Sequence, residues 1–273
     1  MTFTHLHVHS HYSLLRGVDS LESLAQTARD QGMTRFALTD TNALYGFVFY
    51  RQICEEMKLT PIAGAEIVEV GAPAAKPGGQ GRAVLLARGR DGYRSLCRVI
   101  TARHLEPDFS LAAAIRANAE GLVVLSETPA LLESLRDAAP VHAELVPGRG
   151  DRPLRAWARE RGIPCVATND VHFTRPEGRR LHQVLRAIDR NTTIDRVPLD
   201  DLAEPGRTFA GADEMERRLS HAPEAIENAA RLGEECAADW PMGQTVFPSF
   251  DLDRGTAAEV LSARCQAGIL HRY

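Results

Sequence analysis

The chain has 273 residues and a formal net charge of −4, because 36 Asp and Glu residues outnumber 32 Lys and Arg residues. With 44% hydrophobic and 25% charged residues it can bury a sizeable core, which excludes a mainly disordered protein, and the net charge argues against a simple basic nucleic-acid clamp. No run approaches the ~18–20 consecutive apolar residues of a membrane span, and the first residues lack a secretory signal, so we expect a cytoplasmic protein that does not contact a membrane.

Short apolar runs alternate with segments of helical periodicity as far as Asn169. The apolar runs predict seven strands: Phe3–Val8, Phe36–Leu38, Thr60–Val70, Ala83–Ala87, Leu122–Leu125, Ala143–Val146 and Cys165–Ala167. Helices are predicted between them, the first opened by a capping box of Asp19 and Glu22. This alternation predicts an α/β fold with a parallel sheet and helices outside, closed into a β/α barrel so that no sheet edge is left open.

After Asn169 the strand alternation stops and the sequence becomes helical. Helices are predicted at Arg179–Asp189, Ala212–Leu219, Pro223–Cys236 and Thr256–Arg272, with an extended piece at Val246–Leu252. We therefore predict a barrel over residues 1–175 and a helical C-terminal extension over residues 176–273. The last helix runs to the chain end without a stop signal, so we expect the extension to be a connector to a following domain that this chain lacks.

The strongest chemical signal is the run from His5 to His11 at the end of the first predicted strand. Alternate residues of a strand share a face, so His5, His7 and His9 are expected to point the same way. Two imidazoles two residues apart can chelate one Zn²⁺ or Mn²⁺ ion. The alternatives are an expression tag, a surface cluster, or histidines that hold structural hydrogen bonds.

Polar side chains also follow two other predicted strands. Glu66 stands in an otherwise apolar segment, and Asp170 and His172 follow the seventh strand, again two residues apart. A buried carboxylate is costly unless it is paired or bound to a metal. Together with the histidines, these residues predict a hydrolytic metal site at one end of the barrel. The alternatives are an ion-paired surface role for Glu66 and a helix-capping or Asx-turn role for Asp170.

Seven segments resemble PHP (polymerase and histidinol phosphatase) domains, most closely those of bacterial DNA polymerase III alpha subunits, which are C-family polymerases. In chain order they are His7–Gly17, Ala37–Gly46, Pro61–Glu66, Leu85–Ala87, Gly121–Ser126, Val166–Phe173 and Phe247–Leu252. The resemblance implies a distorted seven-stranded β/α barrel with up to three metals at one end. It also implies phosphate-ester hydrolysis in active members, including 3′–5′ exonuclease activity in polymerases whose metal cluster is intact.

The resemblance divides the ligand positions of this chain into two groups. Five residues match family ligands: His7, His9, Glu66, Asp170 and His172. Four family ligands are replaced, by Arg16, Thr41, Arg82 and Thr128. Two arginines repel cations and two threonines cannot replace imidazole or thiolate, so we expect one Zn or Mn ion at most and no full three-metal cluster. Alternatively, Arg16 pairs with Asp170 or Glu66 and forms a metal-free polar plug.

The resemblance therefore implies the N-terminal PHP region of a DNA polymerase III alpha-type replicative or repair polymerase, a DNA-directed nucleotidyltransferase in its full-length form. We expect a mainly structural role for this segment and assign no catalytic residue. The expected partners are DNA, through the full-length polymerase, and replisome proteins. The alternatives are a metal-dependent phosphoesterase or 3′–5′ exonuclease that acts on DNA ends, and a module that only binds a replisome protein.

Overall fold

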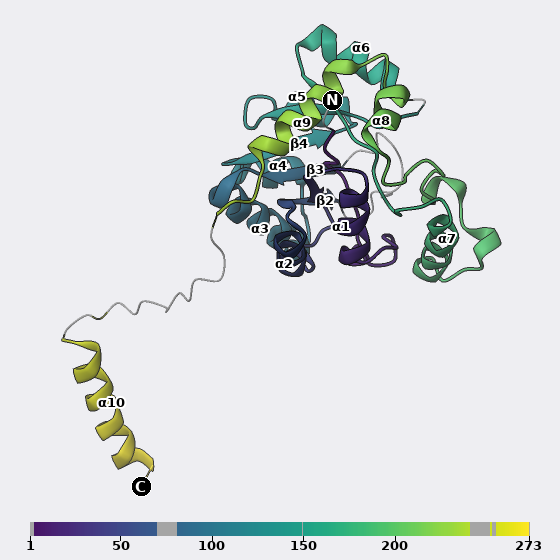
Figure 1. Ribbon diagram of the computed structural model, residues 1–273. Helices are drawn as coiled ribbons and strands as arrows, with labels where there is room; N and C mark the ends of the chain where they lie inside the picture. Colours follow the sequence, from purple (N-terminus) through teal and green to yellow (C-terminus); the bar gives the residue numbers. More distant parts are fainter. Residues whose placement is uncertain (1–2, 70–80, 149, 241–251, 253–254, 273) are drawn as a thin grey trace. The chain divides into compact units, whose positions relative to one another are not determined.

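The structure is a computed structural model that describes residues 3–69, 81–148, 150–240, 252 and 255–272 (Figure 1). The chain divides into two units, Met1–Trp240 and Pro241–Tyr273. The domain boundary that we expect near residue 175 stays a prediction.

In the described residues, six strands of the first unit form one sheet in sequence order. They are β1 (Arg35–Leu38), β2 (Thr60–Val68), β3 (Arg82–Ala87), β4 (Leu122–Ser126), β5 (Val141–Leu145) and β6 (Cys165–Ala167). The predicted α/β class is confirmed, but the all-parallel prediction is wrong, because β3 runs antiparallel to both β2 and β4. The Gly-, Ala- and Pro-rich sequence between β2 and β3 lacks the helical periodicity of a crossover, and antiparallel neighbours need none.

The predicted first strand, Phe3–Val8, is not a regular strand, so the described residues contain six strands and not seven. Its backbone nevertheless bonds to both edges of the sheet. The amide of Ala37 in β1 donates to the carbonyl of His5 (2.8 Å), and on the other side Val171, just after β6, donates to His7 (3.0 Å). This segment therefore lies where a seventh strand would close the sheet, and it places its histidines between the two edges.

Helices follow most of the strands, as the periodicity predicts. They are α1 (Leu21–Asp30), α2 (Phe47–Met57), α3 (Gly89–Leu105), α4 (Leu111–Ala117), α5 (Pro129–Leu135) and α6 (Asp151–Arg161). The predicted capping box is wrong in its first residue. The Ser20 side chain caps α1 by accepting from the amide of Ser23, while Asp19 accepts from the amide of Thr174 (2.6 Å). Asp19 thus ties the start of α1 to the segment after β6.

The segments after β6 form helices close to the predicted positions. They are α7 (Gly178–Asp189), the short 3₁₀ turns η1 (Ile194–Arg196) and η2 (Leu199–Asp201), α8 (Ala212–Arg218) and α9 (Pro223–Glu235). α9 packs against β6 and β1, on the two edges that the N-terminal segment joins. Its buried side chains, Ala225, Ile226, Ala229 and Leu232, extend the barrel core.

The second unit contains α10 (Ala257–Arg272), the last helix that the sequence predicts. Its role as a connector stays a prediction. The predicted extended piece at Val246–Leu252 lies outside the described residues except for its last position. None of the described helices combines the length and apolar character that crossing a membrane requires.

Candidate metal centre

The five predicted ligands come together at one end of the barrel. The Nε2 atoms of three histidines lie at nearly equal distances from one oxygen, Oδ1 of Asp170. These distances are 3.4 Å from His7, 3.3 Å from His9 and 3.3 Å from His172. Glu66 stands behind them, with a carboxylate oxygen 3.7 Å from His7 Nε2 and the other 4.0 Å from His9 Nε2. His5 is different, because its Nε2 donates to the carbonyl of Ala210 (2.8 Å). His5 thus holds a structural hydrogen bond, which was one of the alternatives to metal binding.

His9 is oriented by a hydrogen-bond network that places the proton of its neutral ring on Nδ1. The Ser13 hydroxyl donates to Asp40 (2.6 Å) and accepts from the amide of Thr41 (3.1 Å). Its remaining lone pair faces His9 Nδ1 at 2.9 Å, so Nδ1 carries the proton and donates. In the neutral ring, Nε2 therefore presents a lone pair toward Asp170.

His7 is oriented in the same sense by Glu144, a residue of β5 that the sequence analysis missed. His7 Nδ1 donates to Oε1 of Glu144 (2.7 Å), and this oxygen also accepts from the Thr168 hydroxyl (2.7 Å). Carboxylates that hold the second nitrogen of a ligating histidine in this way fix its ring and raise its basicity. A carboxylate inside the apolar run of β5 is the signal that could have identified it, as it did for Glu66.

The donor atoms at the centre can hold a metal ion. Nε2 of His7, Nε2 of His9 and Oδ1 of Asp170 are buried and have no hydrogen-bond partner among the described residues. Ligands held tetrahedrally about 2.05 Å from a zinc ion lie about 3.3 Å apart, which matches the distances to Asp170. Unpartnered buried atoms of this kind are costly unless a ligand satisfies them. The residues present thus suit a metal ion, in two overlapping groups that share His9: His7, His9 and Glu66, and His9, Asp170 and His172.

Arg82 and Thr41, two of the replaced ligand positions, occupy the remaining carboxylate oxygens. Arg82 Nε donates to Oε1 of Glu66, and Thr41 Oγ1 donates to Oε2 of the same carboxylate (2.9 Å). Arg82 Nη2 also donates to Oδ2 of Asp170 (3.1 Å). The guanidinium therefore lies between the two carboxylates and makes the kind of ion pair that the polar-plug alternative gave to Arg16.

The other two replaced positions lie differently. Arg16 lines the same cavity of about 220 Å³ as Arg82, beside the metal centre, and Glu66 is one of the charges that act on it. Thr128 is buried at the start of α5 and is not among the described residues that line this cavity. Its neighbour Glu127 does line it. Glu127 was not predicted, because the resemblance to the family points to the next residue, Thr128.

The charges of the centre are strongly coupled. Burial alone would raise the pKa of Glu66, but Arg82 and the two histidines outweigh it and lower the pKa to about 2. Burial alone would lower the pKa of His7, but Glu144 and Asp170 raise it to about 9. The pKa of Asp170 lies well below its usual range, because Arg82 and His7 outweigh the effect of its burial. Both carboxylates are therefore ionised at neutral pH, and Arg82 together with protonated His7 supplies positive charge beside them.

Comparisons with known proteins place the chain in a family. The profile of the PHP domain matches residues 5–151, so the chain belongs to the PHP domain family. It is 28% identical over 302 residues to DNA polymerase III subunit alpha of Bacillus subtilis (strain 168), which covers 100% of this chain and 26% of that protein. It is 31% identical over 281 residues to an error-prone DNA polymerase of Anaeromyxobacter sp. (strain K), and this match covers 94% of this chain and 24% of that protein. The predicted resemblance is confirmed, and the chain spans about a quarter of the length of these relatives.

Among solved structures, the chain resembles an amidohydrolase from Chromobacterium violaceum with a TM-score of 0.47 and 13% identity, covering 80% of this chain and 97% of that one. It also resembles a two-domain protein from Bacteroides vulgatus that contains a predicted PHP-like metal-dependent phosphoesterase. The TM-score is 0.45 and the identity 12%, and the match covers 78% of this chain and 62% of that one.

Proposed function

We propose that this chain is the N-terminal PHP region of a DNA polymerase III alpha-type polymerase, with a metal centre reduced to one site and a mainly structural role. The full-length protein extends DNA, in the cytoplasm and with replisome partners, through a polymerase core outside this chain. The whole-chain similarity to two DNA polymerases supports the polymerase assignment. The observation that supports a reduced metal centre is the position of Arg82 between Glu66 and Asp170.

Arg82 limits the number of metal ions because its guanidinium occupies the place of a second ion and supplies positive charge there. It occupies one oxygen of Glu66 and one of Asp170. A divalent ion about 4 Å from a guanidinium is repelled by about 8 kcal/mol at an effective dielectric constant near 20. The unpartnered donor atoms of His7, His9 and Asp170, which Arg82 does not contact, are left for a metal, with His172 beside them.

The same contacts explain a structural role. Arg82 begins β3, Glu66 lies in β2, and Asp170 follows β6, so a single guanidinium joins three parts of the barrel mouth. The pair of His7 and Glu144 joins the N-terminal segment to β5. These cross-links satisfy the buried polar groups at the mouth and hold the N-terminal segment in the sheet.

A second candidate function is a metal-dependent phosphoesterase or 3′–5′ exonuclease that acts on DNA ends. The observation that favours it is the set of unpartnered atoms on His7, His9 and Asp170. An ion bound there would polarise a phosphoryl oxygen and lower the pKa of a bound water. The residues themselves would orient it: Glu144 and Ser13 hold the two imidazoles with Nε2 toward the centre.

Two experiments separate these functions. If the gene continues past the codon of residue 273 into a polymerase core, the polymerase assignment holds, whereas a stop codon there contradicts it. The purified chain is also assayed for 3′ exonuclease and phosphomonoesterase turnover with added Mn²⁺. We expect no turnover above that of a His9→Ala control. Robust turnover that His9→Ala and Glu66→Ala both abolish would establish the second function instead.

A further inference from the structure

A row of arginines lies along one face of α6, away from the metal centre. Arg152, Arg155 and Arg159 follow the spacing i, i+3 and i+7, which puts them on one face over about 10 Å of helix axis. They line a hollow of about 280 Å³ together with His221. None of these residues lines the cavity that contains Arg82 among the described residues.

The arginines of this face differ in their partners. Arg155 Nε donates to Glu224 of α9 (2.6 Å), so this residue anchors the helix. Arg152 and Arg159 are exposed, and in the described part of the chain their side chains have no hydrogen bond or ion pair. His221 adds a buried Nε2 with no hydrogen-bond partner among the described residues, 3.5 Å from Asp151. Glu160 also lines the hollow, but it pairs with Arg161 (3.5 Å), so the guanidinium groups of Arg152 and Arg159 have no acidic partner among the described residues.

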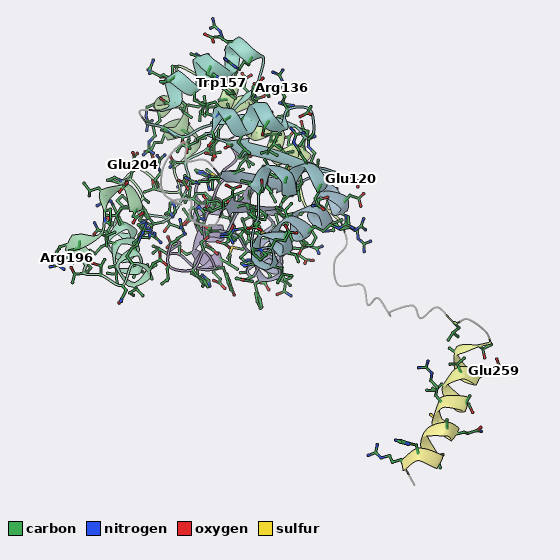
Figure 2. The ribbon with its side chains drawn as sticks, turned by 180° about the vertical axis from the view of Figure 1, so that it is seen from behind. Glu120, Arg136, Trp157, Arg196, Glu204 and Glu259 are labelled. Carbon is green, nitrogen blue, oxygen red and sulfur yellow. The ribbon has the colours of Figure 1, made fainter. Side chains whose placement is uncertain are left out.

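The neighbouring surface favours a ligand that offers phosphates and not bases. Trp157 is the aromatic residue of α6, and the guanidinium of Arg161 covers its ring at 5.0 Å from the centroid. Arg136, at the end of α5, donates to the carbonyl of Arg161 (3.4 Å), and Figure 2 shows Trp157 and Arg136 on the same part of the molecule. With its ring covered, Trp157 is not an open platform for base stacking.

We propose that this face of α6 binds the phosphodiester backbone of duplex DNA without reading its sequence. Guanidinium forks match phosphate oxygens in a bidentate geometry. The row spans about 10 Å, so Arg152, Arg155 and Arg159 can contact neighbouring phosphates of one DNA strand. The net charge of −4 opposes DNA over most of the surface, so the binding depends on this local patch.

The test measures binding of the full 273-residue chain to a fluorescein-labelled 24-base-pair duplex by anisotropy at several salt concentrations. Arg155 is kept because it anchors α6. The variants are Arg152→Ala, Arg159→Ala and the double variant. The matched control, Arg90→Ala with Arg98→Ala, removes the same charge from exposed positions of α3.

We expect each α6 substitution to weaken binding several-fold and the double variant to weaken it at least tenfold. The slope of log K against log salt should fall by about one for each arginine removed. The control should keep wild-type affinity and slope. Equal losses in the α6 and α3 variants, or no loss in either, would overturn the site. Displacement of the duplex by millimolar inorganic phosphate, or by polyglutamate as effectively as by unlabelled duplex, would overturn the choice of DNA. None of these outcomes bears on the metal centre.

Discussion

Replacing Arg82 with methionine in the metal-free chain removes a guanidinium that pairs with two carboxylates, those of Glu66 and Asp170. Arg82 Nη2 lies 3.1 Å from Asp170, and the Arg82 side chain is 11% exposed. At that distance and an effective dielectric constant near 20, one unit pair attracts by about 5 kcal/mol before desolvation is counted. Removing one partner of a buried pair typically costs about 3–5 kcal/mol, because the other charge stays buried and unpaired. We expect Arg82→Met to lose about 4–5 kcal/mol, since Glu66 is left unpaired as well.

Urea unfolding in EDTA, followed by circular dichroism, measures this loss. The matched control is Arg94→Met, because Arg94 pairs with Asp91 at 2.8 Å but both side chains are more than half exposed. We expect the control to lose less than about 0.5 kcal/mol. Adding Zn²⁺ should restore more stability to Arg82→Met than it adds to the wild type, because a divalent ion then replaces the missing positive charge. A loss below about 1 kcal/mol for Arg82→Met would refute the idea that Arg82 holds the barrel mouth together.

Three further predictions concern residues around the centre and the core. Burial lowers the pKa of His142 to about 4, so its neutral form favours folding fully above pH 6.5 and this contribution is lost as the pH falls toward 4. At pH 5 the loss is about 2 kcal/mol, and acid-induced unfolding of His142→Leu should show a correspondingly weaker pH dependence. Glu144→Gln should weaken zinc binding about 10–100-fold in a competition titration, because His7 loses the carboxylate that orients it; unchanged affinity would contradict that role. Gly17→Ala should destabilise the chain by about 1–3 kcal/mol in urea unfolding, because the new Cβ would clash with the carbonyl oxygen of Ser10. Wild-type stability would contradict this prediction and show that the loop can move to make room for the Cβ.

Local patterns predicted much of the fold and of the candidate site. The strand and helix periods located six strands and most helices, and alternate histidines together with strand-end carboxylates identified residues that the structure brings together. The reversal of β3 was harder to predict, because an apolar run carries no direction. The Gly-, Ala- and Pro-rich sequence between β2 and β3, which lacks helical periodicity, was the usable clue.

The ion pairs of the centre could not be assigned from the sequence. Arg82 and Asp170 are 88 positions apart, and His7 and Glu144 are 137 apart, so only the curled sheet and the N-terminal segment bonded to its edges bring them together. The resemblance to the family implied that arginines had replaced ligands, but not which arginine would reach the carboxylates. Side-chain length and the register of β3 against β2, which sets Glu66 opposite Val84, brought Arg82 there.

Counting the metal ions bound to the intact chain tests the central claim most directly. The protein is saturated with Zn²⁺ or Mn²⁺, freed of excess ion by gel filtration, and analysed by mass spectrometry of its metal content. We predict one ion per chain, lost in His9→Ala. Two or three ions per chain with Arg82 in place, or none at saturation, would contradict a centre in which one arginine has taken the place of a metal.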